Sequence, residues 1–248
     1  MSVVYLVLGL PTAGRDEVVF NLIEGGIGEN QPVTLYHAAG EPAEGGLAKL
    51  PQLTRVPFTF NKDHFTIEAP SEPEAEPEAA FFLTDGRANV IDQIEAFPAW
   101  LNSRGWELAR ILLVVDCALA AAHPPVVEWH EACIHFSDCV LLNRRDAANH
   151  VWARLFQKKF AEARYPCVFV LVKHGRVPNP LLVLYPEARR LTLVFDDIDP
   201  VDELDLDEEN LPDEPFTLEN KVDPYFERLL SGHRCKPVPD VTKFLPHT

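Results

Sequence analysis

The chain has 248 residues, 47% of them hydrophobic, and this length is enough for a sizeable core in one α/β domain. No apolar stretch is long enough to cross a bilayer, and no basic leader or cleavage pattern flanks the first one. We therefore expect a soluble cytoplasmic protein that does not bind membranes. The five cysteines are an odd number, and three lie in or beside apolar runs, which favours reduced thiols over a disulfide framework.

The net charge of −16 is concentrated in two segments. Residues 67–78 hold five acidic residues, residues 196–214 hold eleven, and neither segment contains a base. Without those sixteen, 22 acidic residues remain against 22 lysines and arginines, so the rest of the chain is balanced. This balance argues against a nucleic-acid binder, which needs a basic face.

The acidic segment 196–214 also contains aliphatic residues between its acids. Such alternation suits a strip that lies on its own fold or on a basic, partly apolar partner surface, with charge guiding the encounter. We interpret 196–214 as a docking or self-covering strip, with an unidentified protein as the partner if it docks, and a solvated segment is the alternative. The Glu/Pro-rich stretch 68–78 is expected to be only a mobile surface loop.

Strands and helices are expected to alternate through the first 173 residues. The apolar run 3–8 predicts a buried strand, and 16–24 predicts a helix directly after it. Further strands are expected at 33–37, 79–83, 109–116, 139–143 and 167–173, and further helices at 90–103, 125–137 and 147–164. This order predicts an α/β fold with a mostly parallel sheet and helices on both faces.

After residue 173 the pattern changes. The apolar runs 181–185 and 191–195 follow each other without a helix between them, which predicts a C-terminal β-hairpin added at the edge of the sheet. We expect one domain over residues 1–195. An acidic segment and a C-terminal tail would then occupy 196–248, with a short helix at 223–230.

The segment between the first strand and the first helix has the spacing of a phosphate-binding loop. Gly9 and Gly14 stand where the pattern GxxxxGK[ST] places its glycines, but Arg15 and Asp16 follow instead of a lysine and a hydroxyl. In such loops backbone N–H groups wrap a phosphate, the lysine adds charge and the hydroxyl binds Mg²⁺. Arg15 keeps the charge as a planar fork, whereas Asp16 adds a carboxylate. A simple strand-to-helix turn, with the helix capped by its own acids, is the alternative.

Three later strand ends stand in the order expected of a GTPase. They are Thr84-Asp85-Gly86, then Asp116, then Asn143-Arg144-Arg145-Asp146. The last matches the guanine-reading pattern NKxD except at Arg144. In that pattern the Asn holds the loops around the base, the Asp accepts N–H bonds from guanine, and the stem of the basic residue stacks on the ring, which Arg144 can also do.

Residues 1 to about 150 resemble the CobW-like metallochaperone GTPases, most clearly in "LARILLVVDCALAA" and "EACIHFSDCVLLNRRD". The resemblance implies a P-loop NTPase fold of the SIMIBI type, binding of GTP with Mg²⁺, and a role in delivering metal to, or maturing, a partner protein. It implies nucleotide binding by Gly9, Gly14, Arg15, Asp16, Asn143, Arg144 and Asp146, and switch-like positions at Asp85, Gly86 and Asp116.

The chain departs from this family at several functional positions. The Walker lysine is Arg15, the Mg²⁺ hydroxyl is Asp16, and the glutamate after the third strand is Leu83. The family's cysteine cluster should lie near 38–66, where this chain has no cysteine. We therefore expect a degenerate, non-hydrolysing member with a nucleotide-binding or protein-interaction role and no catalytic residues. An active GTP-binding metallochaperone with a divergent loop is the alternative, and a P-loop kinase or ligase, for which no substrate motif is found, is a third reading.

One further cluster, "HEACIHFSDC", brings together His130, Cys133, His135 and Cys139 within ten residues. Zinc needs converging ligands, and on a helix only His130 and Cys133 share a face. Core packing is the favoured interpretation, and no metal site is predicted.

Overall fold

The computed structural model describes residues 2–41, 45–69, 76–145, 150–196 and 222–246. The chain divides into two compact units, residues 1–191 with 238–248, and residues 192–237. The strands of the first unit are β1 (Val3–Gly9), β2 (Val33–Ala38), β3 (Leu53–Asn61), β4 (Thr66–Glu68), β5 (Ala79–Leu83), β6 (Glu107–Asp116), β7 (Cys139–Asn143) and β8 (Val168–Leu171). Its helices are α1 (Arg15–Gly26), α2 (Val90–Arg104), α3 (Cys117–Ala122), α4 (Pro124–Phe136), α5 (His150–Glu162) and α6 (Pro180–Leu184), with 3₁₀ turns η1 (Pro11–Ala13), η2 (Gly45–Lys49) and η5 (Thr242–Phe244).

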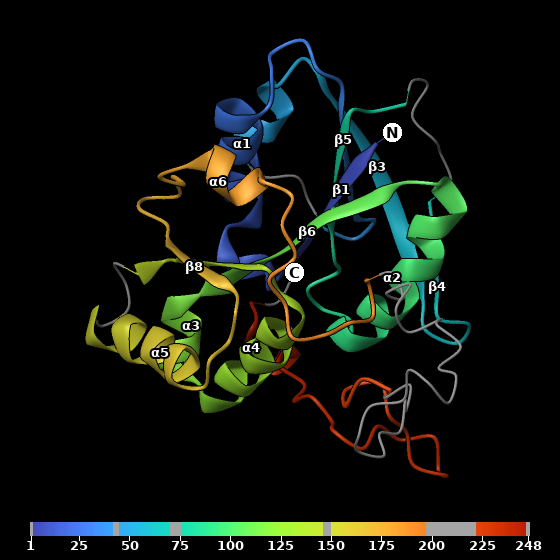
Figure 1. Ribbon diagram of the computed structural model, residues 1–248, viewed down its shortest axis with the longest axis vertical. Helices are drawn as coiled ribbons and strands as arrows, with labels where there is room; N and C mark the ends of the chain where they lie inside the picture. The colour runs from blue at the N-terminus through green and yellow to red at the C-terminus, as the bar shows by residue number, and fades with distance from the viewer. Residues whose placement is uncertain (1, 42–44, 70–75, 146–149, 197–221, 247–248) are drawn as a thin grey trace, which may run out of the picture. The chain divides into compact units, whose positions relative to one another are not determined.

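The strands form one sheet in the order β4-β3-β2-β5-β1-β6-β7-β8 within the described chain (Figure 1). Strand β1 lies at its centre, where Val7 is in register with Leu83 of β5 and Leu112 of β6. Only β4 runs antiparallel to its neighbour among these strands. The predicted α/β class with a mostly parallel sheet is confirmed.

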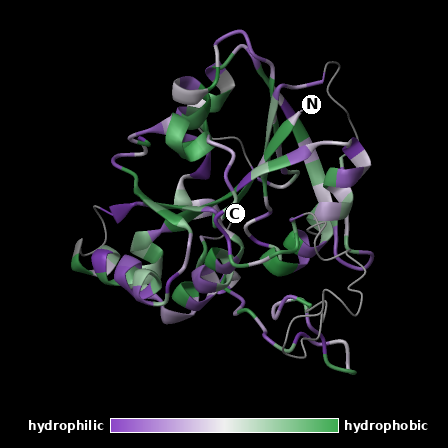
Figure 2. Cartoon of the chain, viewed as in Figure 1, coloured by the Kyte–Doolittle hydropathy of each residue, from purple (hydrophilic) through white to green (hydrophobic). Residues whose placement is uncertain are grey.

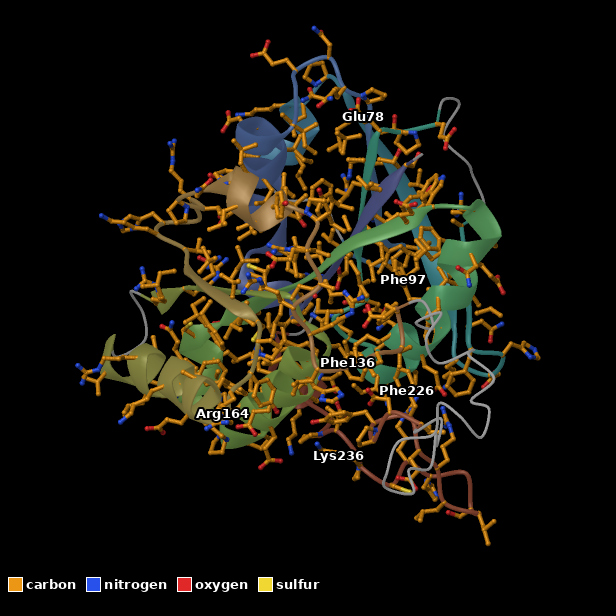
Figure 3. The ribbon with its side chains drawn as sticks, viewed as in Figure 1. Glu78, Phe97, Phe136, Arg164, Phe226 and Lys236 are labelled. Carbon is orange, nitrogen blue, oxygen red and sulfur yellow. The ribbon has the colours of Figure 1, made fainter. Side chains whose placement is uncertain are left out.

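Both faces of the sheet are covered by helices. On one face Tyr5 and Val7 of β1 pack in a buried cluster with residues of α1 and α6, and those two helices contact each other (Figure 1). On the opposite face Phe82 of β5 packs against Trp100 of α2, with ring centroids 4.9 Å apart. Strands β1 and β5 are hydrophobic along their whole length (Figure 2), as expected for parallel strands buried on two faces. Phe97 and Phe136, marked in Figure 3, are fully buried.

Helix α1 includes Gly25 and Gly26 and thus ends two residues beyond the helix predicted over 16–24. A Cβ atom on Gly25 would lie 2.8 Å from Cγ of Pro180, and one on Gly26 would lie 2.6 Å from Cδ1 of Leu184. These glycines therefore serve the close approach of α1 to α6 rather than a helix stop.

The predicted C-terminal hairpin at 181–185 and 191–195 is wrong. Residues 180–184 form α6, which begins at Pro180 after an Asn179 side chain that accepts a bond from the backbone N–H of Leu182 at 3.2 Å. The guanidinium of Arg110, which is 2% exposed, donates to the carbonyls of Leu182 and Glu187 at 2.9 and 3.0 Å. The hydrogen bonds that these carbonyl oxygens need thus come from a buried side chain and not from a neighbouring strand.

The described part of the second unit consists of turns. The helix predicted at 223–230 is wrong, because the Asp223 side chain accepts from the Tyr225 N–H at 3.0 Å and closes a turn there. Arg228 and Arg234 then pair in an antiparallel bridge. In this unit, where Figure 3 marks Phe226 and Lys236, the Lys236 ammonium lies 4.0 Å from the centre of the Tyr225 ring.

No helix in the described ranges is both long and apolar enough to cross a membrane. Most of the acidic segment 196–214 and of the stretch 68–78 lies outside the described residues, so both interpretations stay predictions.

Candidate functional site

Five parallel strands, β2, β5, β1, β6 and β7, lie next to one another and end at the same edge of the sheet. The segments that leave these ends carry the residues that the sequence marked as candidates. In open α/β sheets, ligands bind outside the carboxyl ends of the strands, so this edge is the candidate functional site.

The opening loop depends on both of its glycines. Gly9 has φ 147° and Gly14 has φ 74°, which are backbone conformations that residues with a side chain rarely adopt. A Cβ atom on Gly9 would lie 2.8 Å from the carbonyl oxygen of Val114, and one on Gly14 would lie 2.8 Å from Nδ2 of Asn143. The loop is therefore packed tightly against the ends of β6 and β7, with no room for larger residues.

Asn143 ties the end of β7 to this loop. Its side chain is 3% exposed, and Nδ2 donates to the carbonyl oxygen of Ala13 at 2.8 Å. Arg144 follows with φ 54°, and its side chain is exposed, with Nη2 3.4 Å from the position a Cβ on Gly14 would take. Asp146, the predicted guanine acceptor, lies outside the described residues.

Arg15 is turned into the protein. It is 4% exposed, and its guanidinium donates through Nη1 to the carbonyl oxygen of Thr84 and through Nη2 to the carboxylate of Glu41. The loop itself is also partly closed, because Ala13 N–H donates to the carbonyl oxygen of Leu10 at 3.0 Å and Pro11 has no N–H. The phosphate-binding donors of a working loop are thus reduced in this conformation.

Asp16 is half-buried at the start of α1, and its charge acts on His37 at the end of β2. Burial lowers the pKa of His37 below its usual value, while the bond to the Ala38 carbonyl oxygen and the charges of Asp16 and Glu41 oppose that shift. The charges of Asp16 and Glu41 thus both act on His37, near the end of β2.

The switch-like residues make local bonds. The Asp85 carboxylate accepts from the Arg87 N–H at 2.8 Å, and the Asp85 N–H donates to Gln93 at 2.8 Å. Asp116 is 3% exposed and caps α3 by accepting from the Leu119 N–H at 2.9 Å. Both carboxylates stand at strand ends beside β1, but each serves a turn or a helix cap.

The segment after β5 is also covered by the C-terminal residues of the first unit. Arg87 donates to the carbonyl oxygen of Pro246 at 2.8 Å. A pocket of about 280 Å³ lies between residues 86–90, Trp129 and residues 238–242.

The cluster of histidines and cysteines does not converge. His130 is fully buried in α4, where Nδ1 lies 2.7 Å from the Val126 carbonyl oxygen, and burial lowers its pKa to about 4. Burial raises the pKa of the Cys133 thiol, and raises that of Cys139 to about 12. Within the described ranges, no three His, Cys, Asp or Glu side chains are placed to hold a metal.

Sequence reasoning missed Glu41 and the Thr84 carbonyl as the partners of Arg15. The sequence did contain a signal for Glu41. A strand was predicted at β2, and Glu41 lies three residues after its end, where site residues are expected. Its importance depends on β2 lying beside β5, which the local pattern does not reveal.

No protein-family model matches this chain, and no curated protein matches its sequence. Among solved structures, the chain is similar to the Zn(II)-bound YjiA GTPase from E. coli, with a TM-score of 0.47, 14% identity, and coverage of 75% of this chain and 61% of that one. A Zn(II)-bound triple mutant of YjiA GTPase gives a TM-score of 0.46 and 15% identity, over 87% of this chain and 66% of that one. This chain thus spans less than two thirds of either neighbour, and neither the bound zinc nor the activity transfers to it.

Proposed function

We propose that this chain is a degenerate P-loop protein of the CobW-like GTPase class, which binds a guanine nucleotide without hydrolysing it and acts through a protein partner. The observation that carries the proposal is that one interaction of a nucleotide-binding loop is retained while its charged residue is bonded elsewhere. Asn143 still holds the loop at Ala13, while the charged residue that should serve the phosphates, Arg15, is bonded to Thr84 and Glu41.

The loop fits a nucleotide in part. Its two glycines keep the backbone free of side chains, and the Thr12 hydroxyl oxygen is buried without a hydrogen-bond partner among the described residues. Gly9, Gly14 and Thr12 would line the phosphates, and Arg144 would stack on the base as the residue that follows Asn143. A buried hydroxyl without a partner is costly, so a ligand oxygen there would relieve it.

The arrangement does not favour Mg²⁺ or hydrolysis. Asp16 replaces the hydroxyl that would bind the ion, and Leu83 replaces a glutamate. The Asp85 and Asp116 carboxylates are engaged in a turn and a cap. Because charge stabilisation dominates phosphoryl transfer, the loss of these groups together should remove the reaction.

The proposed partner is a basic, partly apolar protein surface met by the acidic segment 196–214, with a cytoplasmic location in which the thiols stay reduced. The negative charge of this segment supports the proposal of a basic partner surface. Neutralising Asp202, Glu203, Asp205 and Asp207 should weaken partner capture most at low salt, and capture that is unchanged at both low and high salt would remove the docking strip from the proposal.

Calorimetry with GTP, GDP and ATP, with and without Mg²⁺, tests binding, and a steady-state phosphate-release assay tests hydrolysis. We expect measurable guanine nucleotide affinity, lost in Gly14→Val, and release no faster than the no-protein control. Turnover that Gly14→Val abolishes would instead support an active GTPase with a divergent loop. Absence of binding to any nucleotide would leave only a P-loop-like fold with an interaction role.

A further inference from the structure

A single carboxylate joins three segments at the candidate site. The Glu41 side chain, three residues beyond β2, accepts through Oε2 from Nη2 of Arg15 and through Oε1 from the backbone N–H of Gly86, the latter at 3.2 Å. Arg15 begins α1 and Gly86 follows β5. Both oxygens of Glu41 are thus held by donors from the two segments that flank the loop.

These donors are fixed in place and largely removed from water. Arg15 is 4% exposed and the Glu41 side chain 15%. The second bond of Arg15, to the Thr84 carbonyl oxygen, orients the guanidinium from another side. Gly86 is buried, and a Cβ on it would lie 2.6 Å from Cδ of Pro11 and 2.9 Å from the Gly9 carbonyl oxygen. The guanidinium of Arg15 and the Gly86 amide therefore lie together as two donors to one oxyanion directly beside the loop, and we call this pair of donors the seat.

A phosphate group accepts bonds from the same kinds of donor. A guanidinium and a backbone N–H are preferred partners of phosphate oxygens, and charge-assisted bonds of this kind are the strong ones. Two anions cannot occupy one seat, so a phosphate at this place and the Glu41 carboxylate exclude each other.

We propose that Glu41 is a built-in competitor that fills the seat of a nucleotide's terminal phosphate, so that a nucleoside triphosphate binds only after Glu41 has left. This inference rests on the proposed nucleotide binding and deepens it. Release of the Glu41 side chain removes one bond from Arg15 and one bond from Gly86. The chain thereby couples the occupant of the seat to the two segments that border the loop.

Competition of this kind lowers the observed affinity by the fraction of molecules in which the seat is free. If Glu41 occupies it in all but about 1–10% of molecules, removing the carboxylate tightens triphosphate binding by roughly tenfold to hundredfold. A diphosphate, which lacks the terminal group, gains less.

The test is calorimetry on the full chain with the variants Glu41→Gln and Glu41→Ala, using GTP, GDP and inorganic tripolyphosphate. Glu24→Gln is the matched control, because it removes the same charge from an exposed position on α1. We expect both Glu41 variants to bind GTP and tripolyphosphate at least about tenfold more tightly than wild type, with Glu24→Gln unchanged. Thermal melting establishes that each variant is folded.

The double variant Arg15→Gln/Glu41→Gln separates the seat from net charge. Loss of the gain in this variant supports the inference, whereas a gain that persists without Arg15 overturns it. If wild type and the Glu41 variants bind GTP equally, the inference is wrong while the proposed function holds. Tight binding by the Glu41 variants alone supports the competitor and contradicts nucleotide binding by the wild-type chain. Binding by none of the proteins overturns both.

Discussion

Two groups of polar residues that the sequence marks as candidate sites have opposite structural outcomes. Arg15, Thr84 and Asn143 come from three distant parts of the chain and meet around one loop. His130, Cys133, His135 and Cys139 are close in sequence, yet their side chains do not assemble into a ligand set. Polar side chains meet at this sheet because the parallel strands that carry them end side by side. Residues that are close in sequence along one helix do not meet in this way.

The two groups also satisfy their polar atoms differently. Around the loop the bonds cross between elements, from Asn143 to Ala13 and from Arg15 to Thr84 and Glu41. In α4, Nδ1 of His130 bonds to Val126 of the same helix, whereas its Nε2 is buried without a partner among the described residues, and burial raises the pKa of the Cys133 thiol. The first group is a hydrogen-bond network between elements, whereas the second lies within one helix and the strand that follows it.

The largest expected effect tests the packing of the first group. Gly14→Ala places a Cβ 2.8 Å from Nδ2 of Asn143 in a residue with φ 74°. The left-handed backbone costs about 1–2 kcal/mol and the overpacking about 1–3 kcal/mol, so we expect a loss of about 2–5 kcal/mol in the free energy of unfolding. Urea denaturation measures this loss, and nucleotide affinity should fall with it.

Gly105→Ala is the matched control for that variant. Gly105 has φ 63°, close to that of Gly14, but a Cβ there would have no atom within 4 Å. It should lose only the backbone part, about 1–2 kcal/mol. Equal losses in the two variants would mean that the loop is not packed against Asn143 as described.

The parts predicted from the sequence are those that local pattern determines. Nearly continuous apolar runs such as 109–116 identified the central strands, because parallel strands buried on both faces are mostly apolar along their whole length. Glycine spacing identified the loop. The helix α6 was mistaken for a strand because its five apolar residues have no resolvable period, and the buried Arg110 that binds its carbonyls comes from β6. Glu41 was missed for the same non-local reason, since its partners lie on α1 and after β5.

A slightly smaller effect tests whether the second group belongs to the core. The pKa of His130 is lowered to about 4, below the value of 6.5 expected for an unfolded chain. The unfolded state therefore binds the proton first as pH falls, so the free energy of unfolding should decrease between pH 6.5 and about 4, by about 3 kcal/mol from this residue, and no further below that.

His130→Leu should flatten this part of the pH profile. Unfolding in urea at pH 7 and pH 4.5 gives the difference for each protein, and carboxylates that titrate in the same range cancel between them. If both proteins lose the same free energy on acidification, His130 is not held neutral in the core. Stabilisation of wild type by Zn²⁺ would instead return the cluster to the class of metal sites.

The smallest expected effect concerns the two residues that depart from the loop pattern. The double variant Arg15→Lys/Asp16→Thr supplies the compact ammonium and the hydroxyl that working loops use for phosphate and Mg²⁺. Because Asn143 already holds the loop, we expect GTP affinity to rise roughly tenfold, or about 1.4 kcal/mol, in the presence of Mg²⁺ and much less without it.

Arg15→Lys/Asp16→Asn is the control, since it removes the same negative charge but adds no hydroxyl. A gain of equal size in both variants would assign the effect to charge alone. No gain in either, measured by calorimetry with Mg²⁺, would mean that Pro11 and the Ala13–Leu10 bond have closed the cradle, and that the first group keeps the geometry of a nucleotide site without its binding capacity.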